Sequence, residues 1–146
     1  MKIGNVKGLT LVELLIVMVI IGIISAIAYP AYQNNKVEVQ RNDAKAEMLY
    51  IVQRIQTYKS VNGTYLGATV NQLYGASTIP KSGNAFYNVA FANAPTAGGW
   101  ILIATPINGT PQQGNGVLCI NERNQKFWAK GAANCNLSNV SNWDGK

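Results

Sequence analysis

The stretch Leu9–Ala28, LTLVELLIVMVIIGIISAIA, contains one charged side chain, that of Glu13. A helix of about twenty residues rises about 30 Å, which is enough to cross the hydrocarbon core of a bilayer. An ionised side chain inside such a span costs about 2.5–3.5 kcal/mol on insertion scales, so it usually has a partner and a function. We therefore predict a membrane-spanning helix in which Glu13 is a functional residue.

A basic octapeptide, Met1–Gly8 (MKIGNVKG), precedes this stretch. Its two lysines predict a cytoplasmic N-terminus, with the bulk of the chain exported. Two other interpretations stay open. In one, Ala26 and Ala28 form the small-x-small cleavage site of an ordinary secretory signal. The apolar run is, however, longer than the usual length of about 7–15 residues for the hydrophobic region of such a signal. In the other, the span is a simple membrane anchor that tolerates Glu13 near the membrane face.

The sequence Gly8–Glu13, GLTLVE, resembles the class III signal of type IV prepilins. The resemblance implies that residues 1–8 are a leader peptide, that a prepilin peptidase cleaves between Gly8 and Leu9, and that it methylates the new N-terminus at Leu9. It also implies that Glu13 acts in assembly, where its carboxylate pairs with the Leu9 amine of a neighbouring subunit. The family most often has phenylalanine where this chain has Leu9, and another apolar residue there should still be processed.

Helical periodicity continues beyond the hydrophobic half-helix 9–29, which predicts an amphipathic half-helix over residues 30–59. Apolar residues recur there mostly at three- and four-residue steps, at Val37, Ala44, Met48, Ile51, Val52, Ile55 and Tyr58. Pro30 has no amide hydrogen and disfavours α geometry in the residue before it, so we expect a kink rather than an end. Gly22 and Pro30 make the segment between them the weakest part of the helix. Asn62–Gly63 then provide turn chemistry that ends it.

The periodicity changes after the helix. Residues 61–84 are rich in Gly, Asn, Ser and Thr and predict a loop with at most one short element. Four strands are predicted beyond the loop, at Ala85–Ala92, Trp100–Thr105, Val117–Asn121 and Gln125–Lys130. Short connections favour an antiparallel meander, and a long helix laid on one face of it makes an α+β fold.

Further motifs extend the resemblance to type IV pilins. Tyr29–Tyr32 (YPAY) resembles the end of their hydrophobic half-helix, and Tyr58–Tyr65 (YKSVNGTY) resembles the helix-to-loop passage of PilE-like minor pilins. The implied fold is the pilin lollipop, a long kinked N-terminal helix packed on a four-stranded antiparallel meander in a periplasmic or extracellular headpiece, residues 30–146. The resemblance also implies that a disulfide between Cys119 and Cys135 closes a C-terminal loop.

Composition limits the chemistry that this chain can perform. Two of the 12 Lys and Arg residues lie in the leader, so the mature chain has 10 basic and 6 acidic residues, a net charge of +4 before the termini are counted. The chain has two cysteines, both in the exported part, where an oxidising compartment lets a pair persist as a disulfide. It has no histidine and no cysteine cluster, so we expect neither a metal nor a cofactor. No acid–base pair emerges from the six carboxylates, so we do not expect an enzyme.

A weaker signal is the sequence KFWAK near the C-terminus. Alternation along a strand puts Phe127 and Ala129 on one face. The other face then carries Lys126, Trp128 and Lys130, which are candidate DNA contacts because lysines can hold phosphates while an aromatic ring stacks on bases. In the alternative interpretation, the lysines protect an exposed edge strand, and the tail or a neighbouring subunit covers the tryptophan. The patch could be extended by Arg123, Lys81 and Lys146.

Together, the residues and the resemblance predict a structural subunit of a type IV pilus, with a minor pilin as the first choice. The expected partners are other pilin subunits through their N-terminal helices, the prepilin peptidase and the inner-membrane assembly machinery, with DNA as a weaker candidate. The subunit is expected in the inner membrane before assembly and in an extracellular fibre afterwards. The implied roles are pilus biogenesis, twitching motility, adhesion or DNA uptake. The alternatives are a major pilin, a DNA-receptor pilin for natural transformation and a type II secretion pseudopilin.

Overall fold

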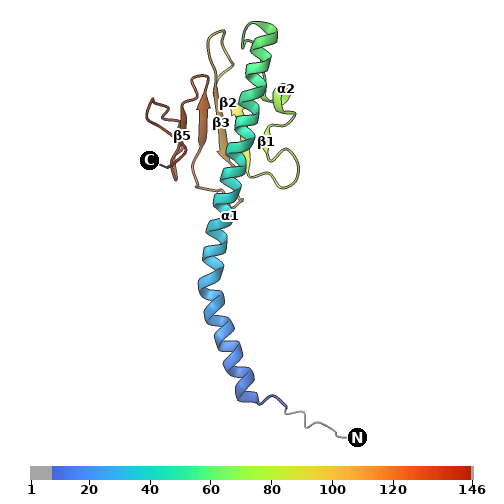
Figure 1. Cartoon of the computed structure of the whole chain (residues 1–146), viewed down its shortest axis with the longest axis vertical. Coiled ribbons are helices and arrows are strands. Elements are labelled where there is room, and N and C mark those ends of the chain that lie inside the picture. The colour runs from blue at the N-terminus through green and yellow to red at the C-terminus, as the bar shows by residue number, and fades with distance from the viewer. Residues whose placement is uncertain (1–7, 146) are drawn as a thin grey trace. The chain divides into compact units, whose positions relative to one another are not determined.

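The computed structural model describes residues 8–145, so residues 1–7 of the predicted leader and the terminal Lys146 lie outside the described residues. The chain divides after Lys36 into two compact units. Figure 1 shows the elements along the chain and labels all of them except β4. They are α1 (Leu11–Asn62), α2 (Val70–Tyr74), β1 (Thr78–Ile79), β2 (Tyr87–Phe91), β3 (Ile101–Pro106), β4 (Leu118–Asn121) and β5 (Lys126–Trp128). The second unit, residues 37–146, is called the headpiece below.

Helix α1 continues without interruption through Pro30. The prediction that this proline does not end the helix is therefore confirmed. The helix also reaches Asn62, where the amide of Gly63 donates to the Lys59 carbonyl oxygen at 2.7 Å and Gly63 has a φ of 74°. A left-handed glycine directly after the last helical residue is a common way to end a helix.

The five strands form one antiparallel sheet in chain order, β1-β2-β3-β4-β5. The antiparallel meander is thus confirmed, but the predicted number of four strands is wrong. The additional strand, β1, consists of Thr78 and Ile79, which pair with Asn88 and Tyr87 of β2. Two residues are too few for an alternating pattern to be detected in the sequence. The β1 strand can therefore be recognised only from its pairing with β2 in the structure.

The segment predicted to be a loop with at most one short element also contains α2. The Thr69 hydroxyl caps this helix by accepting from the Gln72 amide at 3.3 Å, and Gly75 ends it with a φ of 83°. Threonine before a helix and glycine after it are recognisable signals, but a five-residue helix is too short to show a period. The other four strands lie within their predicted ranges, apart from β3, which extends by one residue to Pro106.

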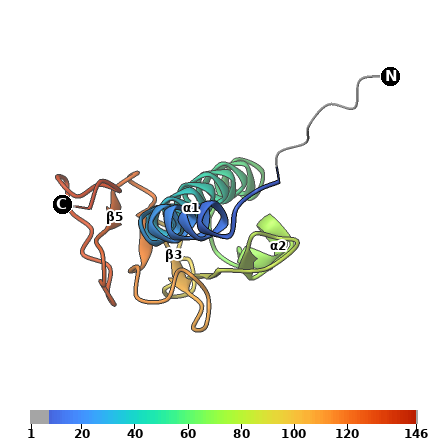
Figure 2. The same ribbon diagram turned by 90° about the horizontal axis from the view of Figure 1, so that it is seen from below.

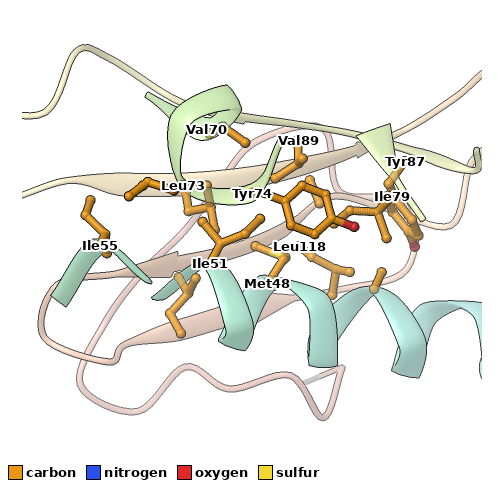
Figure 3. Packing of buried hydrophobic residues seen from close by; sticks show 14 of the residues in the cluster. Met48, Ile51, Ile55, Val70, Leu73, Tyr74, Ile79, Tyr87, Val89 and Leu118 are labelled. Carbon is orange, nitrogen blue, oxygen red and sulfur yellow. The ribbon is translucent and has the colours of Figure 1, made fainter. Parts of the chain in front are cut away.

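The headpiece core lies between α1, α2 and one face of the sheet. The α1 side chains Ala44, Met48, Ile51 and Ile55 are completely buried at helical spacing. They join a cluster with residues of α2 and the sheet, including Val70, Leu73, Tyr74, Val89, Leu102, Leu118 and Ile120. Figure 3 shows Met48 and Ile51 pointing from α1 into this cluster. The predicted packing of the amphipathic half-helix on the sheet is therefore confirmed.

The opposite face of the sheet carries a smaller cluster around Val117, Cys119 and Phe127. The tail that follows β5 covers this cluster, and a disulfide joins Cys119 to Cys135. Figure 2 shows α2 and β5 at opposite sides of the headpiece. The disulfide thus fixes the tail at the β5 side of the sheet, as the predicted C-terminal loop requires.

Candidate assembly surface and candidate DNA interface

Glu13 takes part in a reciprocal cap at the start of α1. Its backbone amide donates to the Thr10 hydroxyl oxygen at 3.2 Å, and its carboxylate accepts from the Thr10 amide at 3.5 Å. This is a capping box, in which two otherwise unpaired helical amides find acceptors. The Thr-x-x-Glu spacing is a recognised sequence signal for such a cap, in addition to the role predicted for Glu13 in assembly. In the single chain, Glu13 therefore has a structural partner within its own helix.

The apolar half of α1 exposes its side chains on every side. Each large apolar residue from Leu11 to Ile27 is at least 48 % exposed. This part of the helix is long and apolar enough to cross a membrane, with a mean hydropathy of 2.9 in its most apolar window. So much exposed apolar surface is unstable in water, so it needs lipid or other helices around it.

Trp128 is buried and cannot stack on a base. Its side chain is 9 % exposed, and the Arg41 guanidinium carbon lies 3.9 Å from the centroid of the indole. The Lys45 ammonium nitrogen lies 5.7 Å from the same ring. The indole Nε1 donates to the Asn115 carbonyl oxygen at 2.9 Å, while Gly145 of the tail approaches the ring so closely that a Cβ there would lie 2.7 Å from it.

The predicted role of Trp128 as an exposed DNA contact is therefore wrong, although the alternation behind it is correct. Phe127 and Ala129 belong to the cluster under the tail, whereas Trp128 belongs to the core cluster beneath α1. The face that carries Trp128 is thus the face that α1 covers. Strand alternation gives the face of a side chain, and only the tertiary structure gives what covers that face.

The basic residues near β5 lie at the edge of the sheet. Lys130 is exposed, and Lys126 is half-buried with its ammonium nitrogen 5.5 Å from the Trp143 ring centroid. The side chain of Arg123 is 76 % exposed, and its Nε lies 3.3 Å from a carboxylate oxygen of Glu122. We call Arg123, Lys126 and Lys130 the basic edge.

The other two proposed members of the patch do not join the basic edge. Lys81 follows β1, at the opposite edge of the sheet from β5. Lys146 lies outside the described residues.

The tail closes the hydrogen-bonding edge of β5. The Trp128 amide donates to the Asn142 carbonyl oxygen at 3.2 Å. The Trp143 indole donates to the Cys119 carbonyl oxygen at 3.0 Å, and Lys45 of α1 donates to the Trp143 carbonyl oxygen at 3.0 Å. Tail backbone thus blocks part of the β5 edge, which the alternative interpretation had expected to be exposed and protected by lysines. The tail also covers Trp128, as that interpretation expected.

A buried polar network joins α1 to the connection between β3 and β4. The completely buried Gln112 accepts from the Tyr87 hydroxyl at 2.9 Å and from the Asn115 side-chain amide at 2.6 Å. Its own amide donates to the Val37 carbonyl oxygen at 2.8 Å and to the Gln40 side-chain oxygen at 3.1 Å. Burial raises the pKa of the Tyr87 phenol to about 12. No sequence pattern marked Gln112, because its partners lie far from it along the chain.

The fold and these sites define a class of protein, namely an α+β domain that follows an apolar N-terminal helix with one acidic residue. Two family models match the chain. The model described as "Type IV minor pilin ComP, DNA uptake sequence receptor" covers residues 30–121, and that of the prokaryotic N-terminal methylation motif covers residues 3–29. The chain belongs to the type IV minor pilin ComP family and begins with the N-terminal methylation motif.

Two proteins, each described as type IV major fimbrial protein FimA of Dichelobacter nodosus, are 37 % identical over 100 residues and 36 % identical over 97 residues. These alignments cover 66 % and 64 % of this chain, and the chain spans 60 % and 59 % of those proteins. A crystal structure of the non-core minor pilin PilV of Neisseria meningitidis aligns with a TM-score of 0.45 and 18 % identity, covering 67 % of this chain and 93 % of that one.

Proposed function

We propose that this chain is a minor subunit of a type IV pilus, assembled through its N-terminal helix. The observation that carries the proposal is the exposed apolar part of α1, Leu11–Ile27, which requires lipid before assembly and neighbouring helices afterwards. The membership in a minor pilin family supports the same role. The subunit would wait in the inner membrane with its N-terminus in the cytoplasm and would then enter an extracellular fibre. We propose no catalytic activity for it.

Processing creates the group that Glu13 needs. Cleavage between Gly8 and Leu9 and methylation of Leu9 by the prepilin peptidase would leave a positively charged amine at neutral pH. In an apolar filament core, the Glu13 carboxylate of one subunit and the Leu9 amine of the next would neutralise each other. A subunit placed out of register would leave both charges unpaired at a high cost in free energy. The segment from Gly22 to Pro30 would be the part of the helix that yields when the subunits pack.

The substitution Glu13→Gln tests the charge separately from the cap. Glutamine at this position can still complete a capping box, so the helix should begin normally. We expect normal membrane insertion and leader cleavage, measured by fractionation and intact mass, but loss of the subunit from sheared pili. Thr10→Val is the matched control, since it removes the capping hydroxyl and keeps the charge, and it should still incorporate. Normal incorporation of Glu13→Gln would refute the role of the charge.

A second function, DNA binding, is supported by the description of the family as a DNA uptake sequence receptor and by the basic edge. We propose that Arg123, Lys126 and Lys130 contact the phosphate backbone, without a stacking contribution from Trp128. These three residues lie beyond the segment that the family model matches, which ends at Asn121. The family match therefore does not itself include the basic edge, and the experiment below tests the edge separately.

The DNA proposal can be tested with the full chain in detergent micelles and a labelled duplex. Alanine at Arg123, Lys126 and Lys130 together should weaken binding at low salt and reduce the slope of log K against log salt by about 0.9 for each lost phosphate contact. A control chain with alanine at Arg54, Lys59 and Lys81 removes the same charge elsewhere and should bind nearly as well as the unchanged protein. Equal effects of the two triple substitutions, or no binding at low salt, would exclude the basic edge.

The abundance of the subunit in purified pili separates the remaining roles. A trace component is expected for a minor pilin, whereas a dominant one would indicate a major pilin. A subunit that is absent from pili but required for protein export would indicate a secretion pseudopilin.

A further inference from the structure

A hollow of about 380 Å³ lies between α1 and the β1 edge of the sheet. Two carboxylates of α1, those of Asp43 and Glu47, line it. We call it the acidic hollow. The rest of its lining is apolar and consists of Ala46 of α1 together with Ile79, Pro80 and Phe86.

The two carboxylates of the acidic hollow lack a compensating cation. Asp43 and Glu47 are four positions apart on α1, so they are neighbours on one helix face, where like charges repel each other. No lysine or arginine stands three or four positions from either of them. Within residues 8–145, neither carboxylate forms an ion pair. A cation supplied by another molecule would therefore relieve the repulsion.

A buried hydroxyl group lies beside Glu47. Tyr74 is 4 % exposed, and its hydroxyl oxygen has no hydrogen-bond partner among the described residues. Figure 3 shows this hydroxyl directed toward Ile79, which lines the acidic hollow. Burial and the neighbouring Glu47 carboxylate raise the pKa of the phenol to about 12. The hollow and its inner wall thus combine two carboxylates without a cation and a hydroxyl group without a partner.

The occupant that fits this hollow is a lysine or arginine side chain. The apolar stem of such a side chain can lie on Ile79, Pro80 and Phe86 while its cationic end donates to the carboxylates. The basic edge offers side chains of this kind, but β5 and β1 are at opposite edges of the sheet. Figure 1 shows the two strands on opposite sides of the headpiece. The basic edge of one copy can therefore reach only the acidic hollow of another copy.

We propose that copies of this chain in one membrane bind head to tail, with the basic edge of one copy in the acidic hollow of the next. Because the two surfaces differ, each bound copy keeps a free hollow or a free edge, and further copies can join in a row. Exposed ion pairs are individually weak, so the contact requires the high local concentration that α1 spans in one bilayer provide. The inference rests on the proposed membrane stage of the subunit and requires neither pili nor DNA.

The test uses the full chain in phosphatidylcholine vesicles, with half of the copies isotopically labelled. These lipids carry no net charge and do not compete for the basic edge. A carbodiimide joins a carboxylate to an amine without a spacer, and mass mapping of the fragments locates each link. We expect links between labelled and unlabelled copies to join a carboxylate of the acidic hollow to a lysine of the basic edge. Links spread equally over other exposed groups, or no links between copies, would overturn the proposal.

Two charge reversals locate the contact. Glu47→Arg should lower the yield of links between Asp43 and Lys126 by about fivefold, because repulsion replaces attraction while both linked groups remain. Lys130→Glu should lower the yield similarly. When unlabelled Glu47→Arg copies are mixed with labelled Lys130→Glu copies, the intact hollow of the labelled copies meets the intact edge of the unlabelled ones. Links should then return, which excludes misfolding as the cause of their loss.

Matched controls reverse charges outside both surfaces. Glu38→Arg and Lys59→Glu alter exposed side chains of α1 that do not line the acidic hollow, so they should leave the yield of links unchanged. Equal losses in the control and test variants, or no return of links in the mixture, would overturn the proposal. Such a failure would leave the proposed pilus role standing, since incorporation into sheared pili is measured separately.

Discussion

At the residue scale, the Glu13 side chain has one observed partner within its own chain and one proposed partner in a neighbouring subunit. In the single chain, it completes the cap with Thr10 at the start of α1. In the proposed filament, the same carboxylate would accept from the Leu9 amine of a neighbour. A carboxylate has two oxygens and about four acceptor positions, so the cap and the intersubunit pair are chemically compatible.

Tyr74 and Tyr87 should make stability depend on pH in the alkaline range. Burial raises the pKa of each phenol from 10.0 to about 12. Because the folded state holds these protons more tightly, the resulting stabilisation is complete below pH 10 and is lost as the pH rises toward 12. Urea unfolding between about pH 8 and 11.5 should show this decline. Tyr87→Phe should reduce the dependence, while Tyr32→Phe at an exposed position should leave it unchanged, and a flat profile would contradict the prediction.

Gly116 should not tolerate a side chain. Its φ is 94°, and a Cβ at this position would collide with the carbonyl oxygen of Ala129. We expect Gly116→Ala to lower the free energy of unfolding by at least about 2 kcal/mol. Gly98→Ala is the control, because Gly98 has open space around it, and its effect should stay within about 0.5 kcal/mol. Similar urea midpoints for the two variants would show that the backbone at Gly116 can rearrange.

At the scale of elements, the tail after β5 is held by links of different chemistry. The Cys119–Cys135 disulfide fixes its first part under the sheet. Two hydrogen bonds then hold its last part at the β5 edge. The Asn142 carbonyl oxygen accepts from the Trp128 amide, and the Trp143 indole donates to the Cys119 carbonyl oxygen. A segment with so few apolar residues buries little surface of its own, so the covalent link supplies the constraint that packing cannot.

Removal of the disulfide should release the tail without unfolding the headpiece. The bond spans a sequence separation of 16 residues, for which the chain-entropy model gives about 3 kcal/mol. Cys135→Ser should therefore lower the free energy of unfolding by up to that amount and make residues 130–145 sensitive to protease, as mass mapping of the fragments can show. Val140→Ala, at a position that is 93 % exposed, is the control and should change neither measurement. An intact tail in Cys135→Ser would mean that its noncovalent contacts suffice.

At the scale of the whole molecule, the two units are suited to different surroundings, because one exposes apolar side chains and the other buries them. Among the described residues, the first unit exposes its large apolar side chains and contributes none to the buried cluster, which consists of headpiece residues from Ala44 to Trp128. The stability of the headpiece core therefore does not depend on side chains of the apolar span. The span, in turn, is suited to lipid or to other helices.

A chain that begins at Tyr29 should fold and remain monomeric without detergent. It lacks the exposed apolar residues Leu11–Ile27 and keeps every residue of the core cluster. We expect a single cooperative urea transition and a monomeric mass by analytical ultracentrifugation. The full chain under the same conditions should require detergent. A broad, noncooperative transition of the shortened chain would show that the span contributes to the headpiece core.

The sequence by itself determined the features that are encoded locally. A continuous apolar run predicts the span, three- and four-residue steps predict α1, and short strands between turn residues predict β2 to β5. The family signal around Gly8 and Glu13 is equally local. These features depend on residues that are neighbours along the chain, so a periodic pattern or a motif is sufficient to find them.

Only the tertiary structure decided what surrounds each side chain. Trp128 is buried because Arg41 of α1 and the tail close over it, and Lys45 binds a tail carbonyl 98 residues away. Gln112 is important because it reaches Val37, 75 residues earlier in the chain. Such contacts depend on how distant segments pack together, and packing leaves no period in the sequence from which to predict them.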